Sequence, residues 1–190
     1  TDWFHVPAII VPYYALIDIF FAMLSPAMFC FVSAMVALEE TDEKTAAYLF
    51  VTPLGRNGYL ASRLGIPSVA AFLVTSVLMP VFKLTSLSTV DIILLAAGGT
   101  LQGIIISLLI LTFSSNKLEG MAITKLSTLM ICGAAIPFFI KHDVQYVLSP
   151  LPYFWIGKTI CESVPIYMLP AFILSITWIC FLLKRYLRKI

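Results

Sequence analysis

The chain has 190 residues, of which 61% are hydrophobic and 12% are charged. Soluble domains carry roughly 25% charged residues, so this composition excludes an ordinary water-soluble fold and predicts a membrane protein. A net charge of +2, without a basic cluster interleaved with aromatic residues, argues against nucleic-acid binding.

Five apolar runs are each long enough to cross a bilayer as a helix of about 20 residues. They cover about 14–37, 64–82, 91–113, 121–140 and 165–183. The sequence therefore predicts an all-α polytopic membrane protein with a single transmembrane domain over 1–190. We expect six spans if the natural protein begins before Thr1.

Basic residues are distributed unevenly among the segments outside the spans. Nine belong to one side of the membrane and three to the other, so the side with 38–63 and the C-terminus is predicted to be cytoplasmic. The nine are Lys44, Arg56, Arg63, Lys117, Lys125, Lys184, Arg185, Arg188 and Lys189, and the three are Lys83, Lys141 and Lys158. An odd number of spans then places the N-terminus outside, which is expected if an earlier span is missing.

The first span contains a carboxylate, Asp18, and several large apolar side chains that include Phe21. Acidic residues within a membrane usually face a cavity or a partner, so Asp18 is a candidate for the translocation path. The alternative is an interfacial acid held by a neighbouring donor. Phe21 either lines a hydrophobic translocation path or packs against lipid or the protein core.

The segment 38–63 is the one long polar interruption, and four of its acids fall within five positions: Glu39, Glu40, Asp42 and Glu43. A charged block between two spans must project into water. We predict that Thr41 caps a short helix there, with acidic side chains in its first turn. Such a helix is either a docking site for a soluble partner or a solvated surface helix that only connects two spans.

The third span carries small residues at Gly99, Gly103 and Ser107, on one helical face. This spacing predicts close packing of helices, within the chain or at an oligomer seam. Gln102 lies in the middle of the same span, where it either hydrogen-bonds another helix or contacts a substrate.

The segment 141–164 is predicted to lie on the external side. Its aromatic residues favour the membrane interface and its prolines break a continuous helix, so we expect interfacial or re-entrant pieces. Glu162 is a further path candidate. Gly157-Lys158-Thr159 imitates the end of a phosphate loop, but the leading glycine is replaced by Pro152, so we expect no nucleotide site and no motor in this chain.

Catalytic and metal sites have no support in the sequence. His5 and His142 have no motif partners, and the four cysteines lack metal-ligand spacing. We therefore expect no catalytic residue, no metal and no cofactor in this chain.

The residues of the polar block resemble the pattern of type-2 ABC transporter permeases. The similarity lies in Glu40, Asp42-Glu43, Thr45, Leu49, Val51-Thr52-Pro53-Leu54, Tyr59-Leu60 and Arg63. Two further stretches, 116–125 and 151–158, are similar to a subgroup of fluoroquinolone-export-type permeases. Arg63 stands where that family usually has Lys, and the family's elbow helix and first span have no counterpart here.

The resemblance implies that 38–63 carries a coupling helix seated in a cleft of a separate ATPase. The implied coupling residues are Glu39, Glu40, Asp42, Glu43, Lys44, Tyr48, Phe50, Thr52, Pro53 and Leu54. It also implies two cytoplasmic ABC ATPases that bind ATP and Mg, a second permease subunit, and a bacterial plasma-membrane location. The cargo is expected to be hydrophobic or amphipathic, because few charges lie within the spans.

Two rival functions remain open at this point. A gradient-driven transporter or channel would use Asp18 or Glu162 for ion coupling. The second rival is a membrane enzyme or a non-transporting scaffold. An enzyme would need a cluster of titratable groups at one membrane depth, which the sequence does not indicate.

Overall fold

In the computed structural model, residues 13–45, 48, 55–140 and 142–189 are described, and no strand occurs among them. Within these described residues, five helical stretches are long and apolar enough to span a membrane: Tyr14–Asp42, Gly58–Phe82, Thr89–Phe113, Lys117–Phe139 and Pro165–Lys189. These observations confirm the prediction of an all-α polytopic membrane protein with five visible spans.

The spans are built from the following helices. They are α1 (Tyr14–Asp42), α3 (Gly55–Leu60), the π-helix η2 (Ala61–Gly65), α4 (Ile66–Phe82), α5 (Thr89–Phe113), α6 (Lys117–Ile131), η3 (Cys132–Ala135), α7 (Ile136–Phe139) and α9 (Met168–Lys189). Two helices, η4 (Asp143–Leu148) and α8 (Pro152–Glu162), connect the fourth span to the fifth, which begins with η5 (Pro165–Tyr167).

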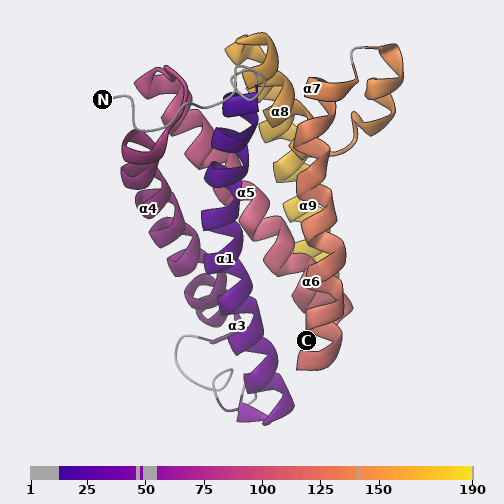
Figure 1. Ribbon diagram of the computed structural model, residues 1–190. Coiled ribbons are helices and arrows are strands. Elements are labelled where there is room, and N and C mark those ends of the chain that lie inside the picture. Colours follow the sequence, from indigo (N-terminus) through magenta and orange to yellow (C-terminus); the bar gives the residue numbers. More distant parts are fainter. Residues whose placement is uncertain (1–12, 46–47, 49–54, 141, 190) are drawn as a thin grey trace.

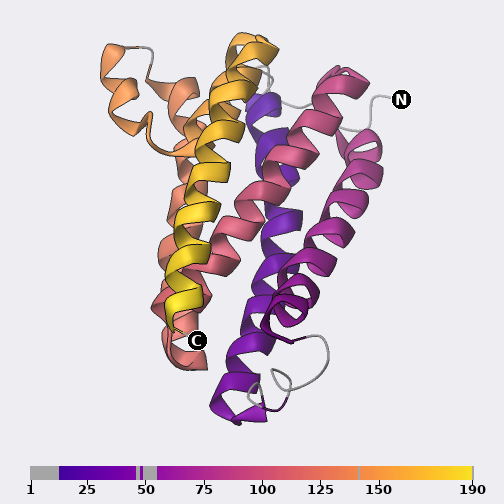
Figure 2. The same ribbon diagram turned by 180° about the vertical axis from the view of Figure 1, so that it is seen from behind.

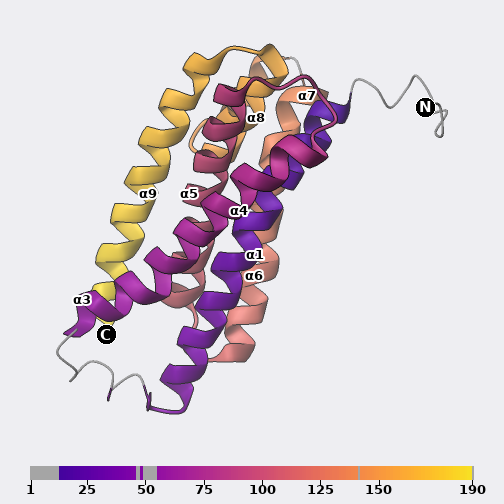
Figure 3. The ribbon, with the colours of Figure 1, turned by 90° about the vertical axis from the view of Figure 1, so that its left-hand side faces the viewer.

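The long helices run alternately up and down, so their ends gather in two groups (Figures 1 and 2). We call one the α3 end; it holds Asp42, Gly55, Lys117 and the C-terminal part of α9. The other, the α8 end, holds the start of α1, the turn between α4 and α5, and α8. Figure 3 shows both ends from the side.

Helix α5 forms the centre of the bundle, and 67% of its most apolar stretch is buried. Its neighbours are α1, α4, α6 and α9. Two glycines of α5 allow its backbone to approach that of α1 closely, because they have no side chain. A Cβ on Gly99 would lie 2.6 Å from the carbonyl oxygen of Ala22, and a Cβ on Gly103 would lie 2.8 Å from the carbonyl oxygen of Pro26. The small-residue face of α5 therefore packs on α1, within the chain.

The expected helix start at Thr41 is wrong. Helix α1 continues through the acidic block to Asp42, and Thr41 donates a hydrogen bond from Oγ1 to the carbonyl oxygen of Ala37 at 2.9 Å, one turn back in the same helix. The acids at positions 39, 40 and 42 thus occupy the C-terminal turn of a span. The chain leaves the helix at Glu43 and Lys44, and Lys44 adopts a left-handed conformation with φ 61°.

The fourth span is also less regular than a single helix from 121 to 140. It begins at Lys117, where the side chain of Asn116 accepts the backbone N–H of Glu119 and caps the helix. A short 3-10 segment, Cys132–Ala135, then interrupts it before Pro137. Pro137 lacks an N–H, which is tolerated in the first turn of the new helix α7.

Candidate coupling site at the α3 end

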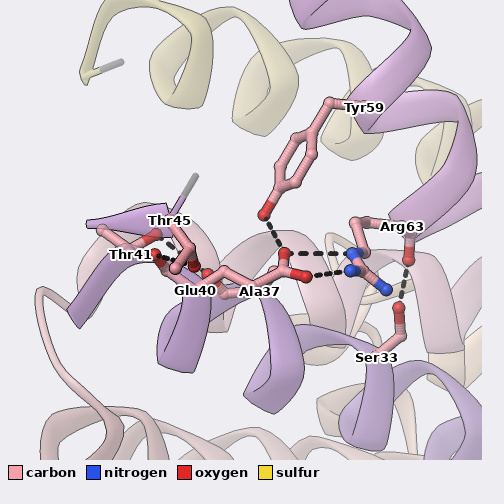
Figure 4. A network of polar contacts seen from close by, with 7 residues as sticks. All are labelled: Ser33, Ala37, Glu40, Thr41, Thr45, Tyr59 and Arg63. Carbon is pink, nitrogen blue, oxygen red and sulfur yellow. Dashed lines mark hydrogen bonds and ion pairs between the residues drawn. The ribbon is translucent and has the colours of Figure 1, made fainter. Parts of the chain in front are cut away.

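Glu40 joins the end of the first span to the start of the second (Figure 4). Its Oε2 accepts hydrogen bonds from Tyr59 Oη at 2.8 Å and from Arg63 Nε at 3.1 Å, and its Oε1 forms an ion pair with the second guanidinium nitrogen. The guanidinium of Arg63 therefore binds the carboxylate of Glu40 through two parallel bonds, the strongest arrangement for such a pair. Ser33 also donates to the carbonyl oxygen of Arg63, so α1 and η2 are joined at two levels.

Glu39 and Asp42 join the same end of α1 to the fourth span. Lys117 Nζ lies 3.1 Å from Glu39 Oε1, and the backbone N–H of Lys117 donates to Asp42 Oδ2 at 3.1 Å. The carboxylate of Asp42 thus reaches the positive N-terminus of α6, where anions are favoured. The Glu39–Lys117 pair is about half exposed and contributes little stability, up to about 1 kcal/mol.

These contacts explain how three acids can occupy the C-terminal turn of α1. Negative charges there oppose the helix dipole. Arg63, Lys117 and the N-terminus of α6 supply the compensating positive charge from distant parts of the chain. The result is that α1, the α3–η2 segment and α6 meet at one polar junction.

Beyond this junction, the described part of the polar block is exposed to solvent. Glu43 and Lys44 are exposed, and Tyr48 is 77% exposed. Phe50, Thr52, Pro53 and Leu54, which are also predicted coupling residues, lie outside the described residues. The structure therefore separates the predicted coupling residues into a tied group (Glu39, Glu40, Asp42) and an exposed group (Glu43, Lys44, Tyr48).

A lysine of the last helix joins the third span to the same end. Lys189 Nζ donates to the carbonyl oxygens of Leu111 at 3.1 Å, Thr112 at 3.3 Å and Ser114. Free carbonyls at the end of α5 are therefore capped by a cation, which also complements the helix dipole. This contact joins α9 to the end of α5, separately from the junction of α1, α3–η2 and α6.

At the opposite end, Asp18 holds the turn between α4 and α5. Its carboxylate, 2% exposed, accepts hydrogen bonds from Leu84 N at 2.8 Å, Thr85 N at 2.9 Å and Thr85 Oγ1 at 2.5 Å. Neighbouring donors hold this acid, as the alternative interpretation of the sequence described. Its role as a path residue stays a prediction.

Lys158 of α8 is 2% exposed and lies among aromatic rings. Its Nζ donates to Tyr146 Oη, lies 4.2 Å from the centre of that ring and 5.0 Å from that of Tyr167, and is 3.6 Å from Glu162 Oε1. Burial alone lowers the pKa of this lysine, but the bond to Tyr146 and the charge of Glu162 raise it, so the net pKa lies above its usual value. Glu162, a predicted path residue, is thus the partner of a buried cation.

The remaining path candidates lie on different helices. Gln102 is 1% exposed, and its Nε2 donates to Ser175 Oγ of α9 at 2.8 Å. Phe21 is 38% exposed and packs against Phe82 with ring centres 5.5 Å apart. Phe21 thus contacts α4, whereas Gln102 contacts α9. Ser107 is buried in α5.

No group of three or more His, Cys, Asp or Glu side chains suited to a metal ion occurs in the part of the chain that the structure describes. The α3 end offers ion pairs and helix ends, and these groups can transmit a displacement among the spans.

Comparison with known proteins places the chain in a family. Residues 2–184 match the family described as fluoroquinolones export permease protein Rv2686c-like. The chain belongs to this family. Two curated relatives from Mycobacterium tuberculosis, the fluoroquinolones export permease proteins Rv2686c and MT2760, are each 27% identical over 154 residues, covering 78% of this chain and 60% of theirs. No solved structure matches significantly.

The chain spans about three fifths of the length of these relatives. Its family and its five apolar helices make it a multi-pass membrane protein of the permease class. The family's name describes an export protein, and this supports a transport role for the chain.

Reasoning from the sequence missed several residues of the polar junctions in this family member. From the sequence, Lys117 and Lys189 were used only to predict which side of the membrane is cytoplasmic. Lys158 was considered as part of a phosphate-loop motif, which was rejected. A signal for Lys117 existed, because Asn116 and Glu119 are typical of a helix start. For Lys158 the one signal was its spacing of four residues from Glu162, and its burial, which depends on the rings of Tyr146 and Tyr167, was not visible.

Proposed function

We propose that this chain is the membrane-spanning subunit of an ATP-driven ABC exporter. In this proposal two cytoplasmic ATPases bind ATP and Mg, a second permease subunit completes the path, and the α3 end faces the cytoplasm of a bacterial cell. The chain itself performs no catalysis. The cargo is a hydrophobic or amphipathic compound, in keeping with the export named for the mycobacterial relatives.

One observation carries the proposal: the exposed segment at Glu43, Lys44 and Tyr48 follows directly on a junction that ties three spans together. When an ATPase binds this segment and moves, the movement displaces the end of α1, which carries Glu39, Glu40 and Asp42. Through Arg63 and Lys117 the same displacement reaches α4 and α6. Opening and closing of the path then follow from one movement at the α3 end.

The test is transport by the full-length permease reconstituted in vesicles with its ATPase. ATP is expected to drive accumulation of a fluorescent amphipathic dye. Glu43→Gln is expected to lower transport several-fold while ATP hydrolysis continues, because the charge lies on the exposed segment and makes no contact needed for folding. Lys125→Gln, an exposed change on α6, is the matched control.

Two results would contradict the proposal. Transport driven by an ion gradient without any ATPase would favour a secondary transporter. Equal coupling in Glu43→Gln and Lys125→Gln would remove Glu43 from the contact with the ATPase.

A further inference from the structure

One face of α9 changes from apolar to cationic toward the α3 end. Ile173 and Phe181 are 64% and 59% exposed, and Thr177 between them is exposed as well. Lys184 and Arg188 continue the row. At about 100° per residue, these five positions fall within an arc of about 80° on the helix surface. Because the apolar part is exposed on a helix long and apolar enough to span a membrane, we expect this face to contact lipid chains.

A pocket of about 310 Å³ lies at the cationic end of this face. It is lined by Phe181, Lys184, Arg185 and Arg188. The guanidinium of Arg185 lies 4.7 Å from the centre of the Phe113 ring, which places it beside the end of α5. Among the described residues, neither Lys184 nor Arg188 forms an ion pair or a hydrogen bond, in contrast to Lys189 next to them.

Three cations with two unpaired charges therefore lie around one apolar side chain, at the depth where a span meets the lipid headgroups. A phosphate would supply the missing negative charge, and guanidinium groups bind phosphate with two parallel bonds. An attached acyl chain would lie along Phe181 and Ile173. A free phosphate would leave this apolar face uncovered, and a soluble protein would not reach it inside the bilayer.

We propose that this pocket binds the headgroup of an anionic phospholipid, with one acyl chain on the face from Ile173 to Phe181. Each cation near an anionic lipid strengthens binding about fivefold. Bound lipid would steady the end of α9, whose Lys189 caps α5. The proposal rests on the membrane location of the chain and is independent of its energy source.

The experiment is native mass spectrometry of the purified permease in detergent, titrated with phosphatidylglycerol or with phosphatidylcholine of the same chain lengths. We expect phosphatidylglycerol to bind at least tenfold more tightly. Arg188→Gln should weaken this binding about fivefold and Lys184→Gln/Arg188→Gln about 25-fold. Lys125→Gln, which removes one charge from the surface of α6, should leave it unchanged.

Several outcomes would overturn the proposal. Two of these are equal binding of the two lipids and unchanged phosphatidylglycerol binding in Arg188→Gln. A third is displacement of the lipid by glycerol phosphate at similar concentration, which would indicate a site for free phosphate. Loss of a co-purifying ATPase from the double variant with lipid binding intact would indicate a protein contact instead. If the double variant does not fold, Arg188→Gln and the charge-preserving Lys184→Arg/Arg188→Lys decide, since the latter must retain phosphatidylglycerol.

Discussion

At the residue scale, the contact between Glu40 and Arg63 is the strongest joint at the α3 end. Both side chains are partly buried, with exposures of 17% and 31%. Glu40→Gln leaves the guanidinium without its counter-charge, so we expect a loss of about 1–2 kcal/mol in the free energy of unfolding. Thermal unfolding in detergent, with Arg63→Gln and the double variant, measures the coupling between the two residues.

The control for this pair is Glu43→Gln, an exposed acid three positions further on that should change stability by less than about 0.5 kcal/mol. Additive effects of Glu40→Gln and Arg63→Gln would show that the two side chains do not interact, and would remove the joint between α1 and η2 from the account.

Asp18 offers a second test at this scale, because its contacts separate a structural role from a role in the path. Asp18→Asn keeps the shape but puts an NH₂ group opposite donors that need an acceptor. We expect a loss of about 1–3 kcal/mol in stability, measured by thermal unfolding. Asp91→Asn, at the exposed start of α5, is the comparison and should cost less. Unchanged stability combined with loss of transport would assign Asp18 to the path.

Sequence reasoning identified the charged residues but could not tell which were paired. Asp18, Glu40 and Glu162 were all recognised as candidates. The partners of Asp18, at positions 84 and 85, are 66 and 67 residues away, that of Glu40, at position 63, is 23 away, and that of Glu162, at position 158, is four away. Pairing over such separations depends on how the helices pack, and only the short Lys158–Glu162 spacing is visible as a helical pair.

At the element scale, α1 carries the most informative difference between expectation and structure. Counting apolar residues ends the first span near residue 37, because lipid excludes the charges that follow. Backbone hydrogen bonds continue the helix to Asp42, since charges are tolerated outside the lipid and are compensated by Arg63 and Lys117. One continuous helix therefore runs from the exposed segment into the bundle.

Close packing of helices depends on three glycines, one of which the sequence pattern did not identify. A Cβ on Gly157 would lie 2.1 Å from the carbonyl oxygen of Ala134, closer than any at Gly99 or Gly103. We expect Gly103→Ala to destabilise the protein by about 1–3 kcal/mol and Gly157→Ala by at least as much, because backbone must move. Thermal unfolding of each variant measures this.

Gly65 is the matched control, since nothing lies within 4 Å of a Cβ placed there. Its backbone is helical, so Gly65→Ala should be neutral or stabilise by up to about 1 kcal/mol. If Gly103→Ala and Gly65→Ala behaved alike, the close contact between α1 and α5 would be wrong.

At the scale of the whole molecule, the contacts of charged side chains described above lie at the two ends of the bundle, and Gln102–Ser175 is a hydrogen bond between spans away from those ends. The number and order of the spans followed from hydrophobicity and length alone, because lipid imposes both. The place of α8 did not follow from them. Its burial against η3 and α9 requires Gly157 beside Ala134, a fit that composition does not reveal.

In the proposed exporter, the force from the ATPase would enter at the α3 end. Glu40 and Asp42 tie the exposed segment to α4 and α6, and Lys189 ties α9 to α5. A push at this end would move the spans together, while the α8 end, held by Asp18 and Lys158, would have to yield when the path opens.

The most direct test of this account is the position of Tyr48 in the working assembly. Tyr48→Cys and Val147→Cys place equally exposed cysteines, 77% and 76% for the native side chains, near opposite ends of the bundle. A cysteine-to-lysine crosslinker is applied to membranes that hold the full-length permease with its other cysteines replaced by serine. The account predicts that Tyr48→Cys joins a nucleotide-binding subunit and that Val147→Cys does not. A crosslink from Val147→Cys alone, or none to such a subunit from Tyr48→Cys, would contradict it.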